Sequence, residues 1–220
     1  IESQKTNGYP FDGHMIMNNF LDWRYNGKFS PREKCFDVGL TVNGALWKYK
    51  EDKTTPFTGC THYKSAGNGG LMRLAPVLIV AKNKSEAIYL ARESTRLTHG
   101  AEEALMYSEI FAEEVWDGRI LPQYVDYRHP LDIDRDDVSS GGYVKETFQA
   151  AWWAYQTTDS FESCIIEAIN LGDDADTVGA VAGMIAGRMY GFEAIPKWMV
   201  EGVQWSEHLI DVSKKLVLLN

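Results

Sequence analysis

The chain has 220 residues, 45% of them hydrophobic and 24% charged, which is the composition of a globular protein and excludes a disordered or fibrous one. Its net charge of −9 argues against nucleic acid or an anionic membrane as a partner, because both are bound through basic surfaces. Its three cysteines, Cys35, Cys60 and Cys164, are far apart and odd in number, which favours a reducing compartment and a cytoplasmic location.

Helical periodicity dominates the chain, and strand-like alternation is almost absent. The apolar spacing predicts helices over residues 14–26, 85–98, 101–116, 146–155, 161–171, 177–190 and 197–219. Residues 74–81 are apolar enough for either a strand or a buried helix, and both readings stay open. The longest apolar stretch near the end of the chain, residues 178–187, is shorter than the roughly 20 residues of a membrane span. The sequence therefore predicts one all-α domain over residues 1–220.

Local signals mark several helix ends. Gly27 and Gly118 follow helical stretches and are expected to terminate them. Ser30 followed by Pro31 predicts the start of another helix, since serine is a good cap and proline suits the first helical position. Asp159 stands three residues before Glu162, which predicts a capping box.

Two irregular segments, residues 51–70 and 121–142, are longer than ordinary connections, so we expect one or both to line a site.

The densest group of potential ligands is Gly172-Asp-Asp-Ala-Asp-Thr, which leads into an expected helix. Asp173, Asp174, Asp176 and Thr177 offer hard oxygen ligands of the kind that magnesium or manganese prefers. Three acids repel one another unless a cation shares them. The alternative is a helix cap with solvated acids.

The helix after these acids has an unusually small face. Gly179, Gly183 and Gly187 recur every four residues, so we expect another backbone to pack closely against it in the centre of the molecule.

A glycine-rich segment lies earlier in the chain. It contains Ser65, Gly67, Asn68, Gly69 and Gly70, and successive amides in such a segment can form a nest for an anion. The alternative is a structural turn. The segment is not a Walker A loop, because no Gly-Lys-Ser/Thr follows it.

Other candidates are isolated. Asp37, two residues before Gly39, is typical of a turn or cap, and His99 suits a helix C-terminus. Tyr143 follows a glycine turn and could form a stacking platform.

Taken in order, the segments FDVGLT, SAGNGGLMRLAPV, LTHG, SSGGYVKETFQAAWWAY, SFESCIIEAINLGDDADTVGAVAGMIAGRMYG and IPKW resemble the ADP-ribosylglycohydrolase family, especially its dinitrogenase-reductase-activating branch. The resemblance covers the chain from Phe36 onward. It implies an all-α orthogonal helical bundle that hydrolyses the glycosidic bond between ADP-ribose and a protein side chain, often arginine. It also implies two magnesium ions, for which manganese could substitute.

The resemblance also assigns roles to matching residues. The implied metal ligands are Asp174, Asp176 and Thr177, and the implied catalytic acids are Asp37 and Asp174. The residues implied to bind ADP-ribose are Gly39, Ser65, Gly67, Asn68, Gly69, Gly70, His99 and Tyr143.

The chain departs from the family pattern at two places. The family's opening Gly-Asp-rich helix and Thr-Asp-Asp-Thr segment, which supply the other half of the metal site, have no counterpart before Phe36, and Leu40 stands where the family often has Asn. We therefore expect either a missing N-terminal segment or a partner to complete the metal site. Two alternatives to the enzyme remain open here: an ADP-ribose-binding or crystallin-like structural protein without activity, and another metal-dependent hydrolase of phosphorylated small molecules.

Overall fold

The computed structural model describes residues 11–119 and 133–219. Within these ranges it is built from helices and contains no strand, which confirms the predicted all-α fold. The longer helices are α2 (Gly13–Asn26), α3 (Leu40–Glu51), α4 (Ala75–Val80), α5 (Lys84–Arg96), α6 (Glu102–Asp117), α7 (Val144–Gln156), α8 (Phe161–Ile169), α9 (Ala175–Tyr190), α10 (Lys197–Gly202) and α11 (Ser206–Val217). The 3-10 turns are η1 (Tyr63–Ser65), η2 (Leu71–Arg73), η5 (Arg135–Asp137) and η6 (Phe192–Ala194). No helix in the described ranges is long and apolar enough to cross a membrane.

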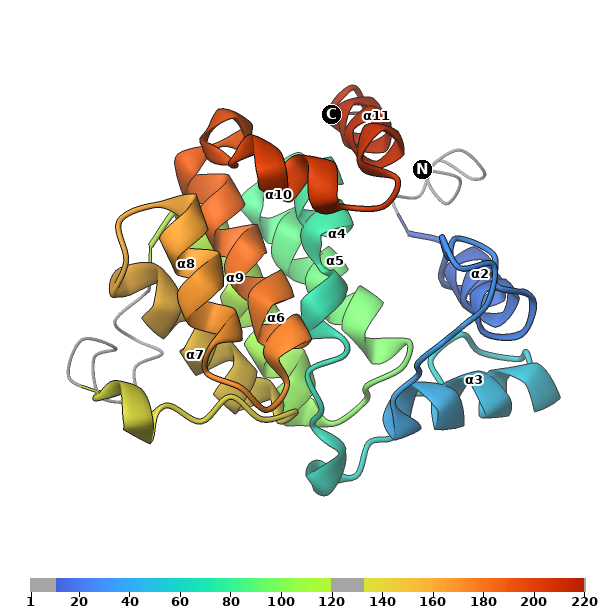
Figure 1. Cartoon of the computed structure of the whole chain (residues 1–220). Coiled ribbons are helices and arrows are strands. Elements are labelled where there is room, and N and C mark those ends of the chain that lie inside the picture. Colours follow the sequence, from blue (N-terminus) through green and yellow to red (C-terminus); the bar gives the residue numbers. More distant parts are fainter. Residues whose placement is uncertain (1–10, 120–132, 220) are drawn as a thin grey trace.

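The helices form a bundle with a smaller pair at one side (Figure 1). Helix α9 packs against α7 and α8, α5 packs against α6, and α11 lies on α4. Helices α2 and α3, drawn in blue, lie together beside this bundle. The sequence between α3 and η2, residues 52–70, connects the pair to the bundle, and it contains the predicted glycine-rich segment.

The core of the bundle lies between α6, α7 and α9. The ring of Phe148 on α7 is fully buried, with its centroid 5.2 Å from that of Tyr107 and 6.4 Å from that of Phe111 on α6. On the other side, a Cβ added at Gly179 of α9 would lie 2.8 Å from the side chain of Ile169 on α8. A Cβ at Gly183 or Gly187 would make only ordinary contacts, at 3.7 and 4.0 Å from the side chains of Ile165 and Phe161, so the expected close approach of another backbone along this face is not seen.

Helix ends follow the local signals where a cap is available. The carboxylate of Asp12 accepts the N–H of Met15 at 2.9 Å and begins α2. Gly27 and Gly118 adopt left-handed backbone angles, with φ of 71° and 70°, and end α2 and α6 as predicted.

The predicted helix from Ser30 is wrong. The Ser30 hydroxyl instead donates to the carbonyl of Lys34 at 2.8 Å and closes a turn. Phe29 and Glu33, on either side, have φ of 63° and 53°, which a right-handed helix cannot accommodate. Helix α3 begins only at Leu40.

Other boundaries differ in detail. Residues 74–81, for which two readings were open, form the short helix α4. The predicted last helix is two helices, because Trp205 has a left-handed φ of 62° between α10 and α11. Helix α8 is capped by Ser160 and Ser163, whose side chains bond each other's backbone, rather than by Asp159 and Glu162.

Candidate active site

A glycine-rich loop, residues 65–70, is held against the turn before α7. The backbone N–H of Asn68 donates to the carbonyl of Gly142 at 3.1 Å, and the N–H of Val144 donates to that of Ala66 at 3.0 Å. These two bonds form a short antiparallel bridge, so residues far apart in sequence share one edge. We call residues 65–70 the glycine loop.

The start of α9 joins this edge through a buried amide. The side-chain nitrogen Nδ2 of Asn68 donates to Asp174 Oδ2 at 2.6 Å and to Thr147 Oγ1 at 2.7 Å. Asn68 is only 8% exposed. The backbone N–H of Asp174 donates to the carbonyl of Ser140 at 3.1 Å. The predicted anion loop and the predicted metal acids therefore meet, although 106 positions separate Asn68 from Asp174.

The surroundings of Asp174 leave one carboxylate oxygen available. A Cβ added at Gly142 would lie 3.4 Å from Asp174 Oδ2, so the turn passes close to this oxygen. The other oxygen, Oδ1, has no hydrogen bond to any residue that the structure describes. Asp174 thus presents a single free oxygen beside the glycine loop.

The other two predicted metal ligands follow on the first turn of α9. Asp176 is exposed, and its Oδ1 accepts the N–H of Thr177 at 3.0 Å. Thr177 is buried, with Oγ1 3.8 Å from the sulfur of Met72.

These oxygens fit magnesium in kind, but the set is incomplete. Hard oxygen ligands suit this ion. Yet in residues 11–119 and 133–219, no group of three or more His, Cys, Asp or Glu side chains is placed to hold a metal. The assignment of Asp174, Asp176 and Thr177 to a metal therefore stays a prediction.

His99 lies beneath the glycine loop and is 2% exposed. A Cβ added at Gly69 would lie 2.9 Å from its Cε1, and one added at Gly67 would lie 3.5 Å from its Nε2. Burial, together with the positive charge of Arg73, lowers the pKa of His99 to about 3. The imidazole is therefore neutral at physiological pH.

The amides of the glycine loop are not equivalent. Those of Gly67, Gly69 and Gly70 make no hydrogen bond with any residue in the described part of the chain and can face an anion. The amide of Asn68 differs from the expectation, because it is already bonded to Gly142. Ser65 donates its hydroxyl to the sulfur of Cys60 at 3.3 Å.

Tyr143 is tied to α6. Its hydroxyl donates to the carboxylate of Glu103, and this bond is the main reason that the pKa of Tyr143 rises to about 12. The ring is half-buried at the edge of the glycine loop. Its contact with a nucleotide stays a prediction.

Asp37 and Gly39 lie in the exposed segment before α3. Helix α3 approaches the glycine loop, since a Cβ added at Gly69 would lie 3.6 Å from Val42 Cγ2. No contact in the described ranges joins Asp37 to Asp174, so the pairing of these two acids stays a prediction.

Sequence reasoning missed four supporting residues. Thr147 shares the Asn68 amide, Gly142 gives room to Asp174, and Arg73 and Thr98 contact each other beside His99. Gly142 belongs to a recognisable glycine turn, whereas a buried threonine in an aromatic helix has no signal in the sequence.

Gly59 is required where the connecting segment passes the end of α5. A Cβ there would lie 2.6 Å from both the backbone nitrogen of His99 and the carbonyl carbon of Thr98. We expect Gly59→Ala to lower the free energy of unfolding by about 1–3 kcal/mol, measured by urea denaturation. The matched control is Gly44→Ala on α3, where no atom lies within 4 Å, and this variant should be neutral or slightly stabilising. Equal stability of the two variants would contradict the close approach.

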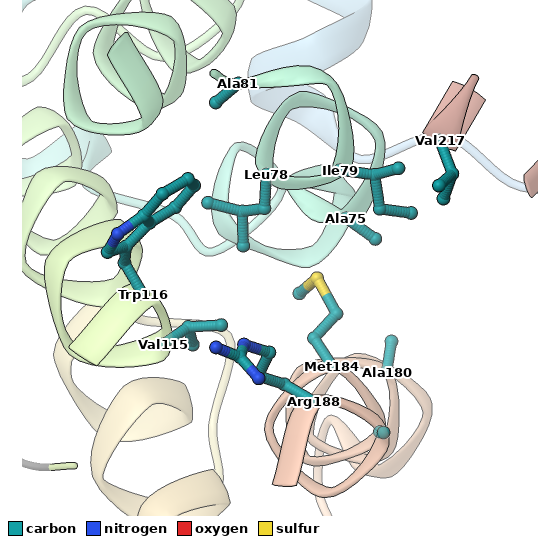
Figure 2. Close-up of a pocket in the computed structure, with 12 residues that line it drawn as sticks. Ala75, Leu78, Ile79, Ala81, Val115, Trp116, Ala180, Met184, Arg188 and Val217 are labelled. Atoms are coloured by element: carbon teal, nitrogen blue, oxygen red, sulfur yellow. The ribbon is translucent and has the colours of Figure 1, made fainter. Parts of the chain in front are cut away.

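A separate apolar groove of about 640 Å³ lies between α4, α6, α9 and α11 (Figure 2). Leu78, Trp116 and Met184 face it, and Arg188 is the one charged residue among its described lining residues. It runs along the middle and end of α9, away from Asp174. The groove lacks the oxygen ligands and free amides that the glycine loop and the start of α9 provide.

The bundle and the loop define a class: an all-α protein in which unbonded backbone amides lie beside carboxylate and hydroxyl oxygens. The ADP-ribosylglycohydrolase family model matches residues 1–220, and the chain belongs to this family of hydrolases. Among solved structures, an "ADP-ribosylglycohydrolase-related protein complex" superposes with a TM-score of 0.78 at 31% identity, covering 96% of this chain and 76% of that one.

Curated relatives carry related names. The chain is 30% identical over 224 residues to the ADP-ribosylarginine hydrolase Tri1 of Pseudomonas putida, covering 94% of this chain. It is 31% identical over 182 residues to the ADP-ribosyl-[dinitrogen reductase] glycohydrolase of Rhodospirillum rubrum, covering 76% of this chain. The matched part spans 60% of the length of each relative.

Proposed function

We propose that this protein hydrolyses the glycosidic bond between ADP-ribose and an arginine side chain of a modified protein. The observation that carries the proposal is the hydrogen bond from Asn68 to Asp174, at 2.6 Å. It fixes a loop suited to a diphosphate next to acids suited to a metal. The names of the relatives from P. putida and R. rubrum support the same chemistry.

The diphosphate of ADP-ribose would lie on the glycine loop. The unbonded amides of Gly67, Gly69 and Gly70 provide a local positive field in a protein of net charge −9. His99, neutral and buried below the loop, can donate or accept a hydrogen bond but does not add charge. The loop thus binds an anion without a basic patch.

Magnesium is the metal that we assign to the start of α9, with manganese as a substitute. Asp174 Oδ1, Asp176 and the hydroxyl of Thr177 would hold it on one side. When bound, such an ion supplies a Lewis acid that orients ribose hydroxyls and lowers the pKa of a water. A two-ion site would need further ligands besides these three.

Asp37 is the carboxylate that we assign to the reacting centre from the chain's own residues. It stands in the exposed segment before α3, whose first turn approaches Gly69. A carboxylate there would stabilise positive charge at the anomeric carbon, or accept a proton from the attacking water.

The direct experiment measures release of ADP-ribose from an arginine-ADP-ribosylated peptide, followed by chromatography. We expect release by the protein in the presence of magnesium and none after chelation with EDTA. A serine-linked peptide tests the choice of acceptor. The absence of release from every conjugate, with magnesium or manganese supplied, would contradict an enzymatic role.

The second candidate is a protein that binds ADP-ribose without cleaving it. It is favoured by the incomplete set of metal ligands in the described ranges. Calorimetry with ADP-ribose and the release assay together separate the two, because this candidate binds ADP-ribose but releases none from any conjugate.

A further inference from the structure

A chain of three polar side chains, from half-buried Arg73 through buried Thr98, ends at buried His99. Arg73 donates from NH2 to Thr98 Oγ1 at 2.8 Å, and Thr98 Oγ1 lies 2.9 Å from His99 Nδ1. Arg73 also donates to the carbonyls of Gly69 at 3.1 Å and Ser94 at 2.8 Å, so the glycine loop and the end of α5 both hold its guanidinium. Thr98 is 0% exposed, so its hydroxyl is shielded from bulk solvent.

The order of donors along this chain determines the tautomer of His99. Arginine can only donate, so Thr98 Oγ1 accepts the bond from Arg73. The threonine hydrogen then needs an acceptor, and His99 Nδ1 is the one that the described hydrogen bonds offer. If Nδ1 donated instead, the buried Thr98 hydroxyl would have no acceptor, which is unfavourable. Nδ1 is therefore unprotonated, and the ring proton of neutral His99 is on Nε2.

The protonated nitrogen lies against the glycine loop from beneath. A Cβ added at Gly69 would lie 3.2 Å from His99 Nε2, and one at Gly67 would lie 3.5 Å from it. Both positions are glycine, so no Cβ crowds the imidazole ring. Nε2 makes no hydrogen bond to any residue in the two described ranges, and it is not one of the fully enclosed side-chain atoms that lack a partner, so it keeps some contact with solvent. A donor beside the glycine loop that has no protein partner and is not enclosed is available to an acceptor on a ligand.

We propose that Arg73 and Thr98 are positioning residues that hold His99 in the Nε2-protonated form, so that it donates a hydrogen bond to an oxygen of ADP-ribose. The inference rests on the proposed function for the identity of the ligand. It assigns His99 the role of a fixed neutral donor rather than that of an acid or base. Arg73 acts through its geometry, since a planar guanidinium can bond all three acceptors at once.

The tautomer can be measured on the ligand-free protein. Long-range proton–nitrogen NMR spectra of histidine-labelled protein distinguish a protonated from an unprotonated ring nitrogen. His99 is assigned among the five histidines by the signal lost in His99→Gln. We expect its proton on Nε2. A proton on Nδ1 would overturn the inference, whatever the protein binds.

Variants of Thr98 test the relay, by which we mean the hydrogen bonds that run from Arg73 through Thr98 to His99. Thr98→Val keeps the shape of the side chain and removes the hydroxyl. We expect it to mix the two tautomers and to raise the dissociation constant for ADP-ribose, measured by calorimetry, about five- to tenfold, as the loss of one hydrogen bond would. Thr98→Ser restores the hydroxyl and should restore both the spectrum and the affinity.

The outcomes separate the relay from the proposed function. If Thr98→Val keeps the wild-type tautomer and affinity, the relay is wrong. If Thr98→Val unfolds, two other variants test the inference. Thr98→Ser must keep the wild-type tautomer of His99, and Arg73→Lys must show a mixture of the two tautomers. If the wild-type protein shows the expected tautomer but does not bind ADP-ribose, the proposed function fails and the positioning of His99 stands.

Discussion

Replacing Asp174 with asparagine is expected to lower the rate of ADP-ribose release by about 100- to 1,000-fold, the loss typical of removing one charge-stabilising group from an active site. Asparagine has the same shape, and its side-chain oxygen can still accept the bond that Asn68 makes with Asp174 at 2.6 Å. The variant therefore removes the negative charge while preserving the contact between the loop and α9. Release from an arginine-linked peptide, followed by chromatography, measures the effect.

Asp173 provides the matched control. It is the adjacent acid, it is exposed, and its φ of 47° is one that asparagine tolerates well. Asp173→Asn should keep the wild-type rate within about twofold, since surface changes of this kind have small effects. Manganese titration by electron paramagnetic resonance gives a second readout, in which Asp174→Asn binds more weakly and Asp173→Asn does not. Equal behaviour of the two variants would remove Asp174 from the site.

The second large effect is on stability at low pH. In the folded protein the pKa of His99 is lowered to about 3, first by burial and then by the charge of Arg73, whereas an unfolded histidine titrates near about 6.5. Between these values the unfolded chain binds a proton that the folded protein does not. Stability is therefore lost as the pH falls from about 6.5 toward 3, with a slope of up to about 1.4 kcal/mol per pH unit from this residue.

The comparison with His99→Gln isolates this contribution from the carboxylates, which titrate in both proteins. Urea denaturation at pH 6.5 and 4.5 should show a wild-type loss about 2–3 kcal/mol larger than the loss in the variant. His62→Gln, on an exposed residue, keeps His99 and should behave as wild type. A parallel decline of the wild type and His99→Gln would mean that His99 is not buried as a neutral ring.

Much of the helical structure could be predicted because its signals are local. The glycines that end α2 and α6 act within one turn of the chain, so Gly27 and Gly118 were readable in the sequence. The wrong helix from Ser30 has the same kind of origin. Serine and proline suit a helix start, but the positive φ of Phe29 and Glu33 is incompatible with a helix there. Neither phenylalanine nor glutamate is a residue type that predicts a positive φ.

The candidate site was predictable as two separate segments. A cluster of acids and a run of glycines have chemistry that is evident without a fold. Their meeting was not evident, because Asn68 and Asp174 are 106 positions apart and Thr147 belongs to a third segment. Resemblance to a family assigned them a common ligand, but the amide that joins them emerged only from the packing of α7 and α9.

The sequence by itself determined that this protein is helical, where most helices start and stop, and which side chains have the chemistry for an anion and a metal. Only the tertiary structure decided that Asn68 fixes Asp174 and that Arg73 reaches His99 through Thr98. Helix periodicity and capping depend on neighbours within about four residues, so they can be predicted from local sequence. Hydrogen bonds between distant buried side chains depend instead on how the helices pack, which no single stretch of sequence specifies.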